Sequence, residues 1–230
     1  MLTLALMMRL GHYLSPTTLR ASLHRLGLRW RRPRLAMPEK VDPQKAHKQW
    51  AIAEAVLTAG PDAVILYADE ARVMTLPLVR SMWQWAGQQV RIPTPGSNVS
   101  RAIFGALNWR TGQWTYLVRE KMCAVDFIAF LEHLLQVYGK HPIILIIDNY
   151  SSHTAGTVAV WLQAHPQIQV YPLPKYCSHL NPVERIWLRM KNRIAANRLQ
   201  GSIKLLLATV DDFFGAMSPA QALRWAAVEK

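Results

Sequence analysis

The 230-residue sequence predicts an α/β fold in which a mixed β-sheet is flanked by helices. Residues 64–68 and 143–147 form continuous apolar runs, which are typical of buried strands. Residues 102–108 and 113–118 flank the turn sequence Asn-Trp-Arg-Thr-Gly and predict a hairpin. Because helical and strand patterns alternate after this hairpin, we expect helices to cover the faces of the sheet.

The elements beyond the hairpin follow from the change between strand and helix periodicity. We expect helices over residues 125–138, 154–165 and 182–197, and strands over residues 143–148 and 168–173. Two further helices are expected around residues 205–214 and 219–228. The sequence contains no GxGxxG or GxxxxGK[ST] pattern, which argues against a nucleotide-binding loop of either type.

The segment before residue 37 predicts a basic arm. Ser15 as N-cap and Pro16 as first residue start a helix that Gly27 would end. A basic extension follows over residues 28–34, and the helix and extension together resemble part of a winged helix–turn–helix. An amphipathic helix joined to a basic connector explains the pattern equally well.

These patterns divide the chain into four segments. Residues 1–36 are the partial helix–turn–helix segment, and residues 37–60 are a proline-containing linker and a helix capped by Asp42. That helix would place Ala46, Trp50, Ala53 and Leu57 on one face. Residues 61–200 form the α/β domain, and residues 201–230 form C-terminal helices that either cover the core or make a dimer contact.

The chain is strongly basic, with a formal net charge of +13 and a pI of about 10.2. Residues 1–60 carry a net charge of +7 and residues 175–204 a net charge of +6, so these two blocks hold the whole excess. Such blocks favour binding to a nucleic acid, although a solvated basic face is the simpler alternative. The candidate DNA contacts are Thr17, Arg20, Arg29, Arg31, Arg32, Arg34, Lys175, Arg185, Arg189 and Arg193.

The cysteines and apolar segments indicate a reducing cytosol. Cys123 and Cys177 are the only two cysteines and form no CxxC motif, so neither a disulfide framework nor a cysteine zinc site is supported. The apolar start is short and contains Arg9, and no other run reaches the length of a membrane span. We therefore expect neither export nor membrane insertion.

Three carboxylates stand where regular structure would hold them rigidly. Asp69 and Asp148 each follow an apolar strand, and Glu184 lies at the start of a helix that contains Trp187. Together they could hold two Mg²⁺ ions, with Mn²⁺ able to substitute, as enzymes that cut and join phosphodiesters do. The alternatives are an acid that ends a strand, an Asp-Asn turn and a helix-capping glutamate.

Polar residues near these acids have weaker assignments. Successive strand side chains point to opposite faces, so at most one of Asp69 and Glu70 should face the site. Asn149 could orient one of the acids, whereas Asn181 is expected to cap the helix. His153 could contact phosphate or a metal-bound water, but a structural hydrogen bond is the more common role. Trp83 and Trp85 could stack on bases, although packing in the core or a hairpin is more common.

Three sequence blocks resemble a known family. They are Tyr67-Ala68-Asp69-Glu70, Asp148-Asn149 with His153, and Pro174-Lys175-Tyr176 through Leu180-Asn181-Pro182-Val183-Glu184 to Trp187 and Lys191. With 35 residues between Asp148 and Glu184, they resemble the DDE transposases of bacterial insertion sequences in the mariner-like superfamily. The resemblance covers roughly residues 15–198 and implies a ribonuclease-H-like fold for residues 61–200.

The resemblance also implies a function. Asp69, Asp148 and Glu184 would be the catalytic triad and the metal ligands. The protein would cleave double-stranded DNA at terminal inverted repeats and join the ends to target DNA, as a homodimer associated with the nucleoid. The family starts with a longer DNA-binding region and carries a proline between the serine and Leu-Asn-Pro, where this chain has His179. The alternatives are a truncated, non-catalytic DNA-binding product and a related nuclease without strand transfer.

Overall fold

The computed structural model describes residues 8–9, 11, 13, 15–29, 42–150 and 152–227. The chain forms two compact units, Met1–Lys40 and Val41–Lys230. In the first unit, α2 spans Pro16–Arg25, and Oγ of Ser15 accepts a hydrogen bond from the Thr18 N–H at 3.1 Å. Gly27 follows with a positive φ of 80°, so both ends of this helix match the sequence prediction. The expected basic extension with Arg31, Arg32 and Arg34 lies outside the described residues.

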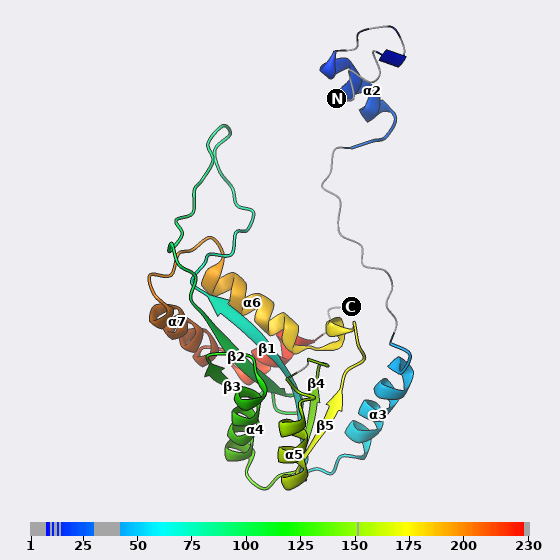
Figure 1. Cartoon of the computed structure of the whole chain (residues 1–230), viewed down its shortest axis with the longest axis vertical. Coiled ribbons are helices and arrows are strands. Elements are labelled where there is room, and N and C mark those ends of the chain that lie inside the picture. Colours follow the sequence, from blue (N-terminus) through cyan, green and yellow to red (C-terminus); the bar gives the residue numbers. More distant parts are fainter. Residues whose placement is uncertain are drawn as a thin grey trace. The chain divides into compact units, whose positions relative to one another are not determined.

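The second unit contains a five-stranded mixed sheet in the order β3-β2-β1-β4-β5. Its strands are β1 (Val64–Met74), β2 (Ser100–Asn108), β3 (Trp114–Arg119), β4 (Ile143–Ile147) and β5 (Ile168–Pro172). The first three strands pair antiparallel, whereas β4 and β5 run parallel to β1. The predicted mixed sheet is therefore confirmed, with its hairpin at one edge (Figure 1).

Helices cover both faces of the sheet because alternate strand residues are apolar on both sides. On one face, α4 (Ala124–Tyr138) and α5 (Gly156–Ala164) pack on residues such as Leu66, Phe104 and Leu145. On the other face, α6 (Val183–Ala195), α7 (Ile203–Gly215) and α8 (Pro219–Ala226) bury Ile103 and Leu107. The helix α3 (Lys45–Thr58) packs against Ile65, Ile144 and Ile146 of β1 and β4.

The C-terminal helices form part of this core. The predicted packing stripe on α6 is confirmed, because its five apolar residues are all buried: Val183, Ile186, Trp187, Met190 and Ile194. Val210 of α7 and Ala222 of α8 are buried in the same cluster. The two helices thus cover the core, which was one of the two expected roles. In the described part of the chain, no helix combines the length and apolar character needed to cross a bilayer.

The structure corrects two predictions about the first strand and helix. The strand does not end at Asp69, because β1 continues to Met74 in antiparallel pairing with β2. The helix begins at Lys45 rather than beside Asp42, and it packs through Ala55 and its neighbours. Trp50 and Leu57 are 63% and 84% exposed, so the predicted packing face was wrong. The prediction placed the large Trp50 ring against the core, whereas the residues of α3 that pack on the sheet are Ile52, Ala55 and Val56.

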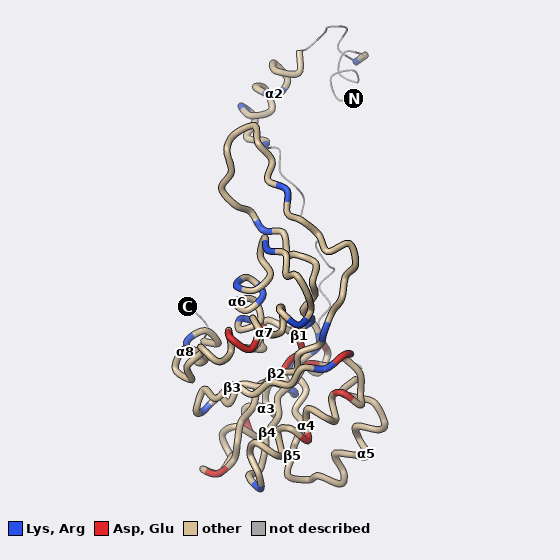
Figure 2. Tube along the Cα trace, turned by 90° about the vertical axis from the view of Figure 1, so that its left-hand side faces the viewer, with Lys and Arg blue, Asp and Glu red and all other residues tan. Residues whose placement is uncertain are grey.

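The connection between β1 and β2 also departs from expectation. Residues 75–99 form a long extension from the sheet (Figure 1), and Trp83 and Trp85 on it are 100% and 81% exposed. Packing of these rings in the core or a hairpin is therefore wrong. The base of the extension is fixed to the end of α6, since the Leu78 N–H donates to Ala195 O at 2.9 Å. Basic positions lie along the extension and along α6 (Figure 2).

Gly105 of β2 provides a test of the packing on the α6 face. A Cβ at this position would lie 2.5 Å from the Trp114 ring and 2.7 Å from the Trp187 ring. We expect Gly105→Ala to lower the free energy of unfolding by about 2 kcal/mol, because overpacking of a filled core forces side chains from their rotamers. Urea unfolding followed by tryptophan fluorescence measures this change.

The matched control is Gly215→Ala at the end of α7, where an added Cβ meets no atom within 4 Å. That substitution should leave the stability unchanged or slightly raised. Equal midpoints for Gly105→Ala and the wild-type protein would contradict this packing.

Candidate active site

Asp69 and Asp148 meet because β1 and β4 pair in a parallel register. The last paired residues are Tyr67 and Ile146, and the same register continued by two residues sets Asp69 level with Asp148. Since β4 ends at Ile147 while β1 continues, both carboxylates lie just beyond the end of the shorter strand. This position is the carboxyl edge of the parallel strands, where open α/β sheets commonly bind ligands.

Glu184 reaches the same edge through a buried asparagine. Nδ2 of Asn181 donates to the carbonyl oxygen of Ala68 at 2.9 Å, directly before Asp69. Oδ1 of Asn181 accepts from the Val183 N–H at 3.2 Å, directly before Glu184. The N-cap of α6 is Pro182 rather than Asn181, so the predicted cap was wrong by one residue, although Asn181 still accepts from the first N–H of the helix. One side chain thus links the strand of the first acid to the helix of the third.

His153 links Asp148 to a fourth carboxylate that the sequence did not indicate. Its Nε2 lies 2.5 Å from Oε1 of Glu70, and its Nδ1 lies 3.3 Å from Oδ1 of Asp148. Burial of the ring opposes protonation, but these two acceptors raise the pKa of His153 to about 10. The ring is therefore a cation between two carboxylates, and it also packs on Phe127 at 4.3 Å between ring centroids. This matches the structural role that we considered more common.

Burial and neighbouring negative charges both act on the Asp69 carboxyl. Burial is the largest cause that raises the pKa of Asp69 to about 8. The negative charges of Glu184, Glu70 and Asp148 raise it further. In contrast, the pKa of Asp148 is lowered, because hydrogen bonds from His153 and the Tyr150 N–H outweigh its burial. Asp69 therefore lies in an excess of negative charge.

The donor atoms at this edge suit a hard divalent cation. Glu70, Asp148 and His153 offer ligand atoms that all lie within 4.8 Å of one another. Asp69 and Glu184 are not in this group, but the negative charges of Glu184 and Asp148 act on the buried Asp69 carboxyl and raise its pKa. Oxygen-rich sets of this kind favour Mg²⁺ or Mn²⁺ over softer metals. Because His153 already pairs with two acids, the carboxylates of Asp69, Asp148 and Glu184 are the better candidate ligands.

Two other predicted site residues, Asn149 and Lys175, make hydrogen bonds that position the loop before α6. Nδ2 of Asn149 donates to the carbonyl oxygen of Leu173, so it positions this loop rather than an acid. The Lys175 N–H donates to Oδ2 of Asp42 at 2.8 Å, and the Lys48 ammonium contacts the same carboxylate. These hydrogen bonds hold the pKa of Asp42 well below its usual range. Asp42 thus fixes the end of the linker to the loop beside the acids.

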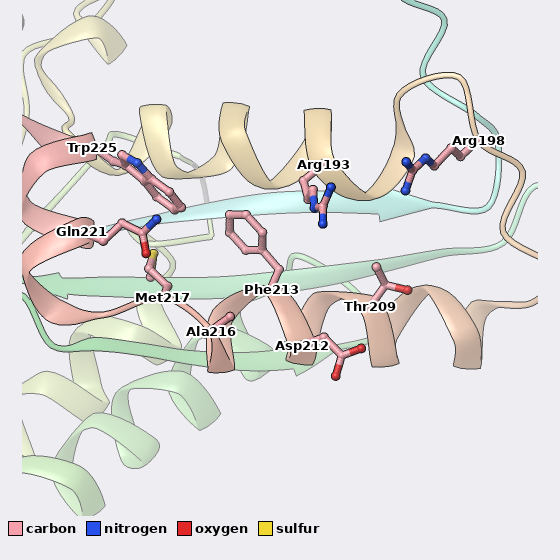
Figure 3. Close-up of a pocket in the computed structure, with 9 residues that line it drawn as sticks. All are labelled: Arg193, Arg198, Thr209, Asp212, Phe213, Ala216, Met217, Gln221 and Trp225. Carbon is pink, nitrogen blue, oxygen red and sulfur yellow. The ribbon is translucent and has the colours of Figure 1, made fainter.

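The arginines of α6 face the C-terminal helix. Arg185 donates to the carbonyl oxygen of Ala227, and the Arg189 guanidinium lies 5.3 Å from the centroid of the Trp225 ring. Arg193 lines a cavity of about 300 Å³ between α6, α7 and α8 (Figure 3). In the first unit, Thr17 and Arg20 are exposed on α2 and Arg29 is exposed beyond it. DNA contact by any of these residues stays a prediction.

Sequence reasoning missed Glu70 and the linking role of Asn181. Strand alternation predicted that at most one of Asp69 and Glu70 would face the site, but Glu70 also reaches it, because His153 from the loop after β4 contacts Glu70 through Nε2. The spacing of five residues from Asp148 to His153 was the available signal. Cys123 and Cys177 are free thiols, and Cys123 donates to Asp126 at the start of α4.

Comparison with known proteins places this geometry in a family. Residues 64–206 match the model of the DDE superfamily endonucleases. The chain is 32% identical over 210 residues to an uncharacterised 39 kDa protein of insertion element IS630 from Shigella sonnei. That alignment covers 91% of this chain and 61% of the relative, so the chain spans about three fifths of the relative's length.

Solved structures of the mariner transposase Mos1 have the same fold. A Mos1 strand transfer complex superposes with a TM-score of 0.68 at 18% identity, covering 96% of this chain and 68% of that one. A Mos1 paired-end complex with Mg superposes with a TM-score of 0.67 at 18% identity, covering 96% and 69%. The ribonuclease-H-like fold implied by the resemblance is confirmed.

The raised pKa of Asp69 gives a pH-dependent stability. In the unfolded chain this carboxyl ionises near 3.8, whereas the metal-free folded protein retains its proton to about 8. The folded state therefore loses stability as the pH rises from about 4 to about 8. We expect Asp69→Asn to raise the unfolding free energy by on the order of 2 kcal/mol at pH 8, and by much less at pH 4.

Urea unfolding in EDTA at the two pH values measures this difference. Asp62→Asn, which changes an exposed acid in the turn before β1, is the control and should give no such gain. A stability of Asp69→Asn equal to that of the wild type at pH 8 would show that neither burial nor like charges raise the pKa of Asp69 in the folded protein.

Proposed function

We propose that this chain, which belongs to the DDE superfamily of endonucleases, is a transposase that cleaves DNA at the ends of an insertion element and joins those ends to target DNA. The observation that carries this proposal is the convergence of Asp69, Asp148 and Glu184 at one edge of the sheet. Parallel strand pairing brings the first two acids together, and Asn181 links the third to the first.

We assign the metal-binding role to Asp69, Asp148 and Glu184, with two Mg²⁺ ions as cofactors and Mn²⁺ able to replace them. The excess of negative charge around Asp69 supports this assignment, because a buried carboxyl among like charges is stabilised by a cation. When bound, such cations activate the attacking water or DNA 3′-hydroxyl and stabilise the departing oxygen of the phosphodiester. The Mos1 complexes determined with Mg and with Mn are consistent with this use of metal.

The remaining residues of the site would hold these acids in position. His153 fixes the Asp148 carboxylate from one side through Nδ1 and anchors itself on Glu70 through Nε2. Asn181 fixes the first turn of α6 and thereby the distance between Glu184 and β1. Rigid placement matters because the attacking and leaving oxygens must lie in line at one phosphorus.

We propose double-stranded DNA as the partner, both at the terminal repeats and at the target, and a homodimer as the assembly. The net charge of +13 supports a polyanionic substrate. The similar structures are described as a strand transfer complex and as a paired-end complex with a left transposon end. A dimer of this chain would supply one catalytic site for each of two DNA ends.

Cleavage of a labelled duplex tests this proposal most simply. The duplex carries the sequence that flanks the coding region, and the full chain is assayed with Mg²⁺ or Mn²⁺. Alanine at Asp69, Asp148 or Glu184 should each lower the cleavage rate by at least about 100-fold, while DNA affinity changes by only a few fold. Glu132→Ala, which removes an exposed acid on α4, is the matched control and should cleave at the wild-type rate.

Three outcomes would contradict parts of this proposal. Cleavage that persists in one alanine variant removes that residue from the triad. Cleavage without dependence on the terminal repeats indicates a general nuclease. Binding without cleavage in the presence of metal indicates a regulatory DNA-binding protein.

A further inference from the structure

A cavity of about 310 Å³ opens directly beside Asp148. It lies between the loop after β4 and the loop before α6, and its walls include Tyr150, Leu173, Lys175 and Tyr176. The volume is at the lower limit of ligand-binding pockets and is enough for one flat aromatic group. The residues of the proposed mechanism use only its Asp148 edge.

Two tyrosines make the cavity suitable for an aromatic ligand. Tyr150 and Tyr176 are 43% and 60% exposed, so both rings present surface to solvent at the site. Tyr176 has a φ of 61°, in the left-handed region that residues with a side chain rarely adopt. Such conformations persist only where the surrounding structure enforces them, and they are concentrated at functional sites.

The walls are held by hydrogen bonds from both sides. The Tyr150 N–H donates to Oδ1 of Asp148 at 3.0 Å, which ties this tyrosine to a proposed metal ligand. On the opposite wall, Leu173 N–H donates to Ile147 O at 2.7 Å, and Asp42 accepts from the Lys175 N–H. The side chain of Asn149 closes the gap between the two loops by donating to Leu173 O. The cavity is therefore formed before any ligand arrives.

The position of the cavity identifies the chemical class of its ligand. A phosphodiester that reacts at Asp148 brings its own nucleotides within reach of the adjoining cavity. The aromatic and aliphatic lining suits the face of a base, whereas Lys175, which lines the cavity and is exposed, attracts the phosphate. A base can enter only after it leaves the duplex stack, which is easiest at a frayed or unpaired position.

We propose that this cavity binds one unpaired base next to the scissile phosphate, stacked on Tyr176, and that it thereby selects a frayed DNA end. The proposal rests on the proposed function, because it assumes that DNA reacts at the triad. Tyr150 supplies the second aromatic wall. Of the three proposed metal ligands, all of which the structure describes, only Asp148 lines the cavity. Binding of the base can therefore be measured separately from cleavage.

The test uses three forms of one duplex that carries the flanking element end. In the first, the terminal nucleotide beside the cleavage position is unpaired 2-aminopurine. The second has an abasic residue there, and the third is fully paired. Binding of the full chain is measured in Ca²⁺. The variants are Tyr176→Ala, Tyr176→Phe and, as a control for loss of an exposed aromatic ring outside the cavity, Trp50→Ala.

The wild type should bind the unpaired duplex roughly tenfold more tightly than the abasic one, which is the size expected for one base–aromatic stack. Tyr176→Ala should lose this difference, whereas Tyr176→Phe and Trp50→Ala should keep it. The 2-aminopurine fluorescence should fall on binding to the wild type and to Tyr176→Phe, but not to Tyr176→Ala.

Equal effects of Tyr176→Ala on base-bearing and abasic duplexes would overturn the proposal, because the ring would then contact no base. The proposal would also be overturned if the wild type bound the 2-aminopurine duplex and the abasic duplex with equal affinity. The two proposals fail separately: a base-dependent effect without metal-dependent cleavage overturns the transposase activity alone. Cleavage without a base-dependent effect overturns the base pocket alone.

Discussion

The parallel register between β1 and β4 is the constraint on which the site depends. It brings Asp69 level with Asp148, because β4 stops at Ile147 while β1 continues along β2. A shift of one residue would turn the Asp69 side chain to the opposite face of the sheet. The residues that pair in this register, 64–67 and 143–146, are apolar and pack on both faces of the sheet, so the position of the acids is a consequence of core packing.

Around this register, polar side chains connect segments that are distant in the sequence. Asn181 joins the start of α6 to β1, His153 joins the loop after β4 to Glu70, and Asp42 joins the linker to the loop before α6. Each connection satisfies buried polar groups whose loss would be costly. The same connections that stabilise the fold therefore also set the geometry of the acids and of the cavity beside Asp148.

Much of this arrangement can be read from the sequence because β4 and the first residues of β1 are continuous apolar runs. The predicted ends of β4, β5 and α6 lie within one or two residues of the observed ends. The residues of the α6 packing stripe were also predicted. The end of β1 could not be predicted, since its last residues pair only with β2 and include Glu70 and Arg72. Trp50 and Trp83 were misplaced because hydrophobicity alone does not show whether a partner surface exists. Glu70 was missed because its partner, His153, comes from a loop more than 80 residues away in the chain.

Binding of Mn²⁺ to the full chain, followed by electron paramagnetic resonance, tests most directly whether the three carboxylates form one site. The measurement compares the wild type with Glu184→Ala and with Glu132→Ala as control. We expect Glu184→Ala to weaken Mn²⁺ binding or to reduce its stoichiometry, while Glu132→Ala binds as the wild type does. Unchanged binding to Glu184→Ala would contradict the account, because Glu184 would then not share a cation with the two aspartates.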